Sequence, residues 1–415
     1  KMMPLRFIYN FLVLLVGNIL KVVALFQPKI QLFVSGRKNT FPELEAKLSP
    51  DKKNIWMHVA SLGEFEQGLP ILERLRKQFP DHRLILTFFS PSGYEVKKNT
   101  SAADVVVYLP MDAISYAKRF LNLVQPEFAL FVKYEIWPNY LKELKQRNIP
   151  TFLVSALFSK RQIYFKPYGG FMRRSLTTFS HFFVQDNSSK ALLQSIGFEN
   201  CTVSGDTRLD RVSEILKRDN QLDFMTEFKN NHPCLVAGST WPEDEELLIP
   251  YINRSDSNFK FVIAPHEIKE AHISKILAAM QKKTICYSEM DNKNLKDYDV
   301  LVVDTIGLLT KIYSYADMAY VGGGFATGLH NTMEPAVFGV PIIIGPKYHG
   351  FKEAEDLVAN GGILSVSNQT EFYKVMDTFI TDAQQREQVG AINANYINTN
   401  VGAADRIIES ISKYL

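Results

Sequence analysis

The amino-acid sequence predicts an α/β protein with two doubly wound, Rossmann-like domains that face a cleft, preceded by an N-terminal membrane-associated helix. The chain of 415 residues exceeds what one hydrophobic core usually organises. Short apolar runs alternate with helical patterns, as in stacked βαβ units. The alternation pauses near Gly205–Arg211 and then restarts, which predicts two consecutive domains.

An N-terminal helix is the first predicted element. Phe7–Phe26 is nearly all apolar, about 30 Å long if helical, and continues into Gln27-Pro28-Lys29 where a signal peptide would have a cleavage site. One side of this helix carries a polar stripe, interrupted by Leu14: Arg6, Asn10, Gly17, Asn18 and Lys21. The stripe favours a helix in the membrane interface, or against the protein, over a span surrounded by lipid. A core helix of the first domain is the alternative.

The predicted strands form two sets of nearly continuous Val, Ile, Leu and Phe, which is typical of buried parallel strands. The first set is Ile55–Ala60, Leu84–Phe88, Val105–Tyr108, Phe128–Val132, Phe152–Val154 and His181–Val184. The second set is Cys234–Ala237, Lys260–Ile263, Thr284–Tyr287, Val300–Val303, Met318–Val321 and Pro341–Ile344. Helical patterns lie between the strands, for example at Gln67–Gln78 and Ala113–Val124, and in the tail at Asp382–Leu415.

These elements predict four segments. Residues 1–36 form the membrane-associated helix, 37–208 the first domain, 209–390 the second domain and 391–415 a C-terminal helix.

The composition excludes several classes of protein. A formal net charge of +3 is too small for the concentrated basic face of a nucleic-acid-binding protein. The three cysteines, Cys201, Cys234 and Cys286, are scattered, which argues against a disulfide framework and predicts small buried hydrophobes. The eight histidines show no metal-ligand spacing, and no Asp-x-Asp follows a predicted strand. We therefore expect no bound metal, and we expect no cofactor.

Ligands of open α/β sheets bind outside the carboxyl ends of the strands, so the loops there are candidate sites. The first is His58–Glu64, in which Gly63 permits a tight turn and Glu64 opens a helix. A carboxylate at this position is suited to general-base catalysis. Ser61-x-x-Glu64 is also a capping box, in which Glu64 only satisfies a backbone N–H.

The second candidate loop is Gly322–Pro335. Its four glycines within seven positions let the backbone approach a ligand, and a following helix N-terminus suits a phosphate. Glu334 is able to accept hydrogen bonds from two ribose hydroxyls. The Rossmann spacing and the P-loop Gly-Lys-Ser/Thr are absent, which disfavours NAD binding and ATP hydrolysis. A purely structural glycine turn is the alternative.

Two further segments are less specific. Gly238–Glu243 contains Thr240-x-x-Glu243, again a capping-box pattern, and Pro265-His266 ends a strand where it could contact a nucleotide. The basic, aromatic stretch Lys160–Tyr168 suits an anionic amphipathic lipid, and a solvated charged loop is the alternative.

Several motifs together resemble the bacterial Kdo transferases, which add 3-deoxy-D-manno-octulosonic acid (Kdo) from CMP-Kdo to the lipid A precursor. The motifs are His58-x-Ala-Ser-x-Gly-Glu64, Ser90-Pro91-x-Gly93-x-Glu95, Glu135-x-Trp137-Pro138-Asn139, Ser159-x-Arg161, Gly205-x-x-Arg208-x-Asp210, and Gly322-Gly-Gly through His330-Asn331-x-x-Glu334-Pro335. They cover essentially the whole chain.

The resemblance implies a GT-B fold, an inverting and metal-independent reaction, and attachment to the cytoplasmic side of the inner membrane. It makes Glu64 the general base and Arg208 a stabiliser of transition-state charge. It implies an acceptor-binding first domain, with contacts from Ser61, Gly63 and Arg161. In the donor-binding second domain it implies CMP contacts from Pro265, His266, Ile306, Gly307, Leu308, Asn331, Thr332, Met333 and Glu334.

Some positions depart from that family. Lys133 stands where an acid is frequent, and a Pro-Arg-His sequence is shortened to Pro265-His266, which leaves the partner of the donor phosphate open. Gln162 and Leu308 replace a frequent serine and a frequent acid. A different nucleotide-sugar enzyme of this fold, such as an epimerase, and an inactive membrane-anchored sugar-nucleotide binder are the competing interpretations.

Overall fold

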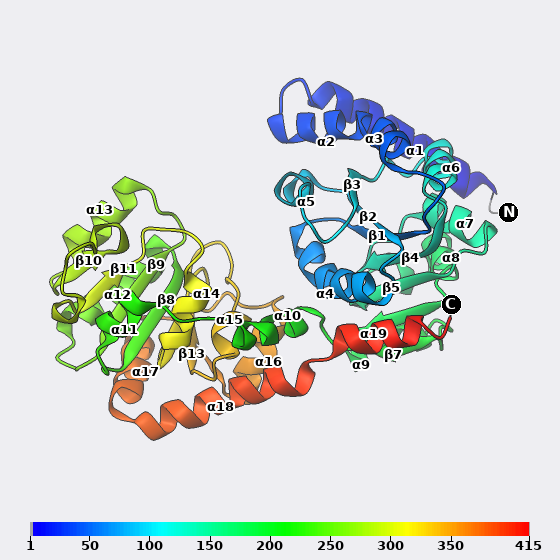
Figure 1. Cartoon of the computed structure of the whole chain (residues 1–415). Helices are drawn as coiled ribbons and strands as arrows, with labels where there is room; N and C mark the ends of the chain where they lie inside the picture. The colour runs from blue at the N-terminus through cyan, green and yellow to red at the C-terminus, as the bar shows by residue number, and fades with distance from the viewer. Residues whose placement is uncertain (1–2, 415) are drawn as a thin grey trace. The chain divides into compact units, whose positions relative to one another are not determined.

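The computed structural model describes residues 3–414, which fold into two compact units. Unit 1 runs up to Asp210 and is completed by residues from Val401 onward, whereas unit 2 is Arg211–Asn400. The division lies two residues beyond the predicted boundary between 208 and 209. In Figure 1 the chain colour changes from blue and cyan through unit 1 to green, yellow and orange through unit 2.

The core of unit 1 is a seven-stranded sheet in the order β3-β2-β1-β4-β5-β6-β7, and all its strand pairs are parallel. The strands are β1 (Asn54–Val59), β2 (Arg83–Phe88), β3 (Val105–Tyr108), β4 (Pro126–Val132), β5 (Thr151–Ala156), β6 (His181–Val184) and β7 (Cys201–Val203). Every residue of β1, β2 and β3 is buried, as the continuous apolar runs predict.

Helices cover both faces of this sheet. They are α3 (Thr40–Lys47), α4 (Leu62–Gln78), α5 (Pro91–Lys97), α6 (Ile114–Val124), α7 (Pro138–Gln146), α8 (Gly170–Leu176), α9 (Asn187–Gln194) and α19 (Ala403–Ile411), with a 3₁₀ turn η1 at Ile163–Phe165. The helix α10 (Arg208–Glu214) contains the last residues of unit 1 and the first of unit 2. One core cluster joins α3, α6, α7 and α8 to one face. A second joins α4 and α19 to the other, so the two groups lie on opposite sides of the sheet.

Unit 2 repeats this architecture with a second parallel sheet, in the order β10-β11-β9-β8-β12-β13-β14. The strands are β8 (Cys234–Thr240), β9 (Lys260–Pro265), β10 (Thr284–Cys286), β11 (Val300–Val302), β12 (Met318–Val321), β13 (Ile342–Ile344) and β14 (Ile363–Ser365). The helices are α11 (Asp223–Lys229), α12 (Pro242–Arg254), α13 (Glu270–Ala279), α14 (Leu309–Ile312), α15 (Met333–Ala336), α16 (Lys352–Asn360), α17 (Gln369–Thr381) and α18 (Ala383–Asn400). The 3₁₀ turns are η2 (Ile215–Lys217), η3 (Tyr287–Glu289), η4 (Leu295–Asp297) and η5 (Tyr313–Tyr315).

The tail differs from the prediction of one C-terminal helix at 391–415. Residues 383–411 form two helices, α18 and α19, separated at Gly402, whose φ of +90° suits glycine. The second helix belongs to unit 1, where Ile407 and Ile411 are buried in the core cluster of α4 (Figure 1). Asp210 accepts hydrogen bonds from the backbone N–H groups of Gly402 and Ala404, and thereby fixes the start of α19.

The N-terminal segment forms two helices, α1 (Met3–Val23) and α2 (Pro28–Lys38), where one helix over 1–36 is predicted. Part of the polar stripe faces unit 1: the Asn139 amide donates to the side-chain oxygen of Asn10 at 2.8 Å, and Arg6 donates to the carbonyl of Pro138 at 3.4 Å. Tyr9 also donates to Asp112 at 2.7 Å. Asn18 and Lys21 remain exposed.

The side of α1 opposite the stripe is apolar and exposed, with Ile8 at 50% exposure and Ile19 at 51%, and Phe7 beside the stripe is 75% exposed. The stretch Leu5–Val23 is long and apolar enough to cross a membrane, and none of its most apolar window is buried in the protein. The alternative of a core helix is therefore wrong. The helix places polar groups against the protein and apolar groups outward.

Candidate active site

The strand order places the candidate sites at the points where the direction of chain progression reverses. In unit 1 the reversal lies between β1 and β4, and in unit 2 between β8 and β12. Open α/β sheets bind ligands at such switch points, outside the carboxyl ends of the strands. The loop with Ser61 and Glu64 follows β1, and the glycine loop follows β12.

Glu64 closes the predicted capping box at the start of α4. Its Oε2 accepts hydrogen bonds from the backbone N–H and from the hydroxyl of Ser61, both at 2.8 Å. Among the residues that the structure describes, Oε1 has no hydrogen-bond partner. Glu64 as a whole is only 6% exposed, but Oε1 is not among the buried side-chain atoms that lack a partner, so it remains accessible. One oxygen is thus fixed by the helix start, and the other keeps its acceptor sites.

A buried polar cluster lies behind this loop, and sequence reasoning did not identify it as a unit. His58 Nδ1 lies 2.8 Å from the Thr87 hydroxyl, and the Trp137 indole N–H lies 3.0 Å from both His58 Nε2 and a Glu135 carboxylate oxygen. His58 is fully buried on β1, three residues before Ser61. The cluster thus ties β1 to the segment after β4. The signal in the sequence was the Glu135-x-Trp137 motif.

Gly63 does not have the predicted role of a tight-turn glycine. It lies in the first turn of α4, and an added Cβ would meet only the Ser61 hydroxyl, at 3.8 Å. Gly93 in α5 is the sterically required glycine. A Cβ there would come within 2.8 Å of the Ser61 backbone and 2.6 Å of the Phe88 ring, so Gly93 lets α5 pack against the loop that carries Ser61.

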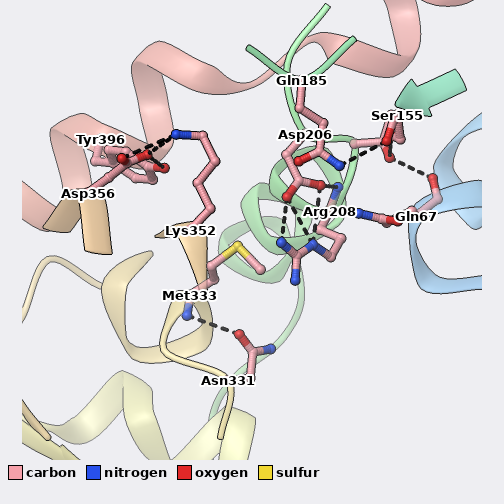
Figure 2. A network of polar contacts seen from close by, with 11 residues as sticks. Gln67, Ser155, Gln185, Asp206, Arg208, Asn331, Met333, Lys352, Asp356 and Tyr396 are labelled. Atoms are coloured by element: carbon pink, nitrogen blue, oxygen red, sulfur yellow. Dashed lines mark hydrogen bonds and ion pairs between the residues drawn. The ribbon is translucent and has the colours of Figure 1, made fainter. Parts of the chain in front are cut away.

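The two basic residues predicted for unit 1 differ in their surroundings. Arg161 is exposed and has no recorded partner among the described residues. Arg208, the first residue of α10, forms a close ion pair with Asp206, in which Nη2 lies 2.6 Å and Nε 2.9 Å from Oδ2 (Figure 2). Asp206 therefore already neutralises part of the charge of Arg208.

In unit 2 the glycine loop is held by Asp244, a fully buried residue that the sequence analysis did not single out. Its Oδ2 accepts from the backbone N–H groups of Gly323 and Trp241, both at 2.9 Å, and its Oδ1 accepts from the Tyr320 hydroxyl at 2.6 Å. Burial raises the pKa of this carboxyl. The predicted box of Thr240 and Glu243 is wrong by one residue, because Pro242 is the first residue of α12 and Trp241 becomes its N-cap.

The glycines of this loop accommodate neighbouring backbone. A Cβ on Gly322 would lie 2.2 Å from the Ser239 carbonyl oxygen, and one on Gly324 2.7 Å from the backbone of Gly345. Gly323 has a φ of +92°, which L side chains rarely adopt. Glycine is therefore sterically required at these three positions, and α15 after the loop is only four residues long.

The structure brings the predicted donor residues Asn331 and Glu334 together. The Asn331 side-chain oxygen accepts from the Met333 N–H at 3.0 Å, and its amide donates to Glu334 Oε1 at 3.2 Å. Glu334 Oε2 accepts from the hydroxyl of Thr310 at 2.7 Å. Thr310 lies two residues after the predicted segment Ile306–Leu308, of which Ile306 is 83% exposed. The hydrogen bond from Thr310 therefore brings the chain just after that segment to Glu334. Thr332 is buried, and its hydroxyl oxygen has no partner.

The other donor residues, Pro265 and His266, lie at the carboxyl end of β9. Pro265 is buried, and the exposed His266 ring stacks on Trp241 with centroids 4.7 Å apart. The Trp241 indole N–H donates to Nε2 of His330 at 3.0 Å, and burial lowers the pKa of His330. Trp241 and His330 were not identified as a pair from the sequence.

Metal ligands do not gather in the part of the chain that the structure describes: no group of three or more His, Cys, Asp or Glu could hold an ion there. Cys201, Cys234 and Cys286 are buried free thiols, as predicted.

Comparison with known proteins supports the resemblance. Residues 35–211 match a family model described as 3-deoxy-D-manno-octulosonic-acid transferase (Kdo transferase). The chain is 27% identical to the 3-deoxy-D-manno-octulosonic acid transferase of Chlamydophila psittaci over 372 residues, which cover 87% of this chain and 85% of that protein.

Two solved structures share the fold. UDP-GlcNAc 2-epimerase from Neisseria meningitidis, solved with UDP-GlcNAc, superposes with a TM-score of 0.62 at 14% identity, covering 87% of this chain and 100% of its own. MurG from Acinetobacter baumannii superposes with a TM-score of 0.57 at 12% identity, covering 87% of this chain and 99% of its own. At these identities the likeness concerns the fold alone, and the predicted GT-B architecture is confirmed.

Proposed function

We propose that this protein transfers Kdo from CMP-Kdo to the lipid A precursor, with inversion at the anomeric carbon. The similarity of the chain to the Kdo transferases, which are glycosyltransferases, supports the proposal. The observation that carries the proposal is the half-occupied carboxylate of Glu64 at the switch point of unit 1. A base is needed there because an acceptor hydroxyl is a poor nucleophile until its proton is taken.

In the proposed reaction, Oε1 of Glu64 takes the proton of the glucosamine 6′-hydroxyl of the acceptor. The hydroxyl oxygen forms a bond to the anomeric carbon of Kdo as the bond from that carbon to the CMP phosphate oxygen breaks. The bonding electron pair leaves with the phosphate, so the products are the glycosylated acceptor, CMP and a protonated Glu64. Oε2 stays bound to Ser61, which holds the carboxylate in place.

Unit 2 is proposed to bind the donor. Glu334 offers carboxylate oxygens to the ribose hydroxyls, while Asn331, Thr332, Met333, Pro265, His266 and Ile306–Leu308 surround the nucleotide. Charge-assisted hydrogen bonds of this type are about twice as strong as neutral ones. The reaction is proposed to need no metal and no cofactor, so Arg208 and the remaining polar groups would meet the developing charge. Ser61, Gly63 and Arg161 are proposed to contact the acceptor.

Attachment to the cytoplasmic side of the inner membrane is part of the proposal, because the acceptor is a lipid. The exposed apolar side of α1 supports it, since an amphipathic helix binds a membrane in proportion to the apolar area it buries.

The test is incubation of the protein with CMP-Kdo and lipid A precursor, followed by mass spectrometry and by NMR of the anomeric configuration. Addition of Kdo with inversion supports the proposal. Mass addition with a UDP-sugar but not with CMP-Kdo contradicts the assigned donor, and a retained configuration contradicts the single displacement at Glu64.

A further inference from the structure

A cationic pocket of about 590 Å³ lies between α1 and the helices α7 and α8 of unit 1. Four basic side chains line it: Arg6, Lys142, Lys145 and Arg174. No acidic residue belongs to its lining. The acids that interact electrostatically with the Arg6 guanidinium are Asp112 and Glu143, and both are buried. Asp112 is already occupied by Tyr9 and by two backbone N–H groups, and Glu143 lies 3.7 Å from Arg147.

Part of this positive charge lacks a protein partner. The Nε of Arg6 is buried and makes no hydrogen bond to any residue that the structure describes, although a buried N–H normally has one. The ammonium of Lys142 has no recorded partner among the described residues. Lys145 donates to the hydroxyl and the carbonyl of Thr177, which also lines the pocket. Lys142 therefore presents unused donors to the pocket, and Arg6 keeps one N–H without a partner beside it.

One edge of the same pocket is apolar. Phe7 lines it and is 75% exposed, and Phe171 lines it beside Tyr9, with ring centroids 5.5 Å apart. Phe7 continues into the exposed apolar side of α1. Donors for an anion and apolar side chains for a hydrocarbon thus stand next to each other, as a phosphate attached to acyl chains requires.

We propose that this pocket binds the phosphate of an anionic phospholipid headgroup while α1 lies in the membrane interface. The phosphate accepts hydrogen bonds from Arg6 and Lys142, and the adjoining acyl chains contact Phe7. The inference rests on the membrane attachment in the proposed function, but it does not depend on Kdo transfer. Anionic headgroups attract each nearby Lys or Arg measurably, and here the attraction is confined to a shaped site.

The test compares two double variants with the same change of net charge. Lys142→Glu with Lys145→Glu alters the pocket, whereas Lys52→Glu with Lys77→Glu alters exposed lysines, the latter on α4 across the sheet. The affinity of the full chain for phosphatidylcholine vesicles that contain phosphatidylglycerol is measured by co-sedimentation. We expect this affinity to fall at least about tenfold for the pocket variant and less than about threefold for the control. Equal losses would show diffuse surface attraction and overturn the site.

Soluble probes separate the sources of phosphate. Calorimetry is expected to detect binding of dihexanoyl phosphatidylglycerol. Dihexanoyl phosphatidylcholine and inorganic phosphate are expected to bind at least about tenfold more weakly. Lys142→Gln, which removes the charge but keeps a polar side chain, is expected to weaken the binding of dihexanoyl phosphatidylglycerol. Inorganic phosphate binding as tightly as the lipid would overturn the headgroup assignment. The assignment would also be overturned if Lys142→Gln raised the KM for the lipid A precursor in detergent micelles by the same factor as it weakens lipid binding. The pocket would then belong to the acceptor site. A loss of transfer activity with vesicle binding intact would concern the proposed function and not this pocket.

Discussion

The loop after β1 in unit 1 and the loop after β8 in unit 2 are built alike, yet they use their carboxylates differently. In each, an acid at the third helical position accepts a hydrogen bond from the backbone N–H of the N-cap: Glu64 from Ser61, and Asp244 from Trp241. Asp244 has both oxygens occupied and is fully buried. Glu64 has one occupied oxygen.

The difference shows how to separate a structural cap from a reactive group when the sequence pattern is the same. A carboxylate whose acceptor sites are filled by the protein has nothing left for a proton from a substrate. A carboxylate held by one oxygen is positioned and still able to act.

Glu64→Gln is expected to have the largest effect. The amide keeps the shape and retains an acceptor oxygen for the cap, but it cannot take a proton. We expect kcat to fall at least about a hundredfold, with CMP affinity and the unfolding midpoint near those of the parent. Steady-state kinetics and thermal unfolding measure the two. A variant with close to the parent rate would show that Glu64, like Asp244, is only a cap.

Asp244→Ala is expected to show the opposite pattern, a loss of stability. Three donors lose their acceptor, and each buried unsatisfied donor costs about 1–3 kcal/mol, so we expect a loss of about 2–5 kcal/mol after relaxation. Denaturant unfolding of the full chain measures it. A variant of parental stability would contradict the assigned role in holding the glycine loop.

The raised pKa of Asp244 also predicts a pH dependence. The folded state holds this proton more tightly than the unfolded chain, so the contribution of Asp244 to stability is present below the ordinary carboxyl pKa and falls as pH rises through the raised value. Asp244→Asn is expected to remove this slope. Unfolding free energies measured across the acidic range test it, and an unchanged slope would assign the dependence to another group.

Glu334→Ala tests whether an already bonded carboxylate also serves a ligand. Glu334 is bonded to Asn331 and Thr310, and it retains acceptor sites. Loss of a charge-assisted bond to ribose is expected to weaken CMP binding by about 1.5–3 kcal/mol. Calorimetry with CMP measures it, with Thr310→Val as a control that removes only the internal bond. Unchanged affinity in Glu334→Ala would place it with Asp244 as a structural acid.

The smallest effects concern two glycines near Ser61. Gly93→Ala is expected to cost about 1–3 kcal/mol, because the Cβ would overlap the Ser61 backbone. It should also lower kcat, since the catalytic loop must shift. Gly63→Ala has room and is expected to change stability by less than about 1 kcal/mol. Unfolding free energies and turnover rates are measured for both variants. A larger loss in Gly63→Ala than in Gly93→Ala would mean that Gly63, and not Gly93, is the position that requires glycine.

The sequence predicted the long buried strands, because nearly continuous apolar runs such as Val105–Tyr108 and Phe128–Val132 leave few alternatives. It missed Cys201–Val203 and Ile363–Ser365, three-residue strands at the sheet edges, where pairing with a neighbour and not composition defines the strand. The box at Ser61 was predicted correctly, whereas the box after β8 shifted by one residue because Pro242 begins the helix.

The sequence predicted which loops form the candidate site, but it did not predict the hydrogen bonds and ion pairs between their side chains. That Glu64 uses one oxygen, that Asp206 pairs with Arg208, and that Trp137 reaches His58 all depend on side-chain directions set by tertiary packing. A motif fixes which residues are present. The number of lone pairs left free is a property of the folded molecule.

The position of α19 has a consequence for how the protein is made. Unit 2 is an insertion between the body of unit 1 and its last helix, so the ribosome must synthesise all of residues 211–400 before Ala403–Ile411 exists. At about 5–20 residues per second, these residues take on the order of 10–40 s. During that time, Phe65 and Leu72 of α4 lack the isoleucines that later share their core cluster. Unit 2 is thus able to complete its fold before α19 is made, while nascent unit 1 still lacks part of one core cluster.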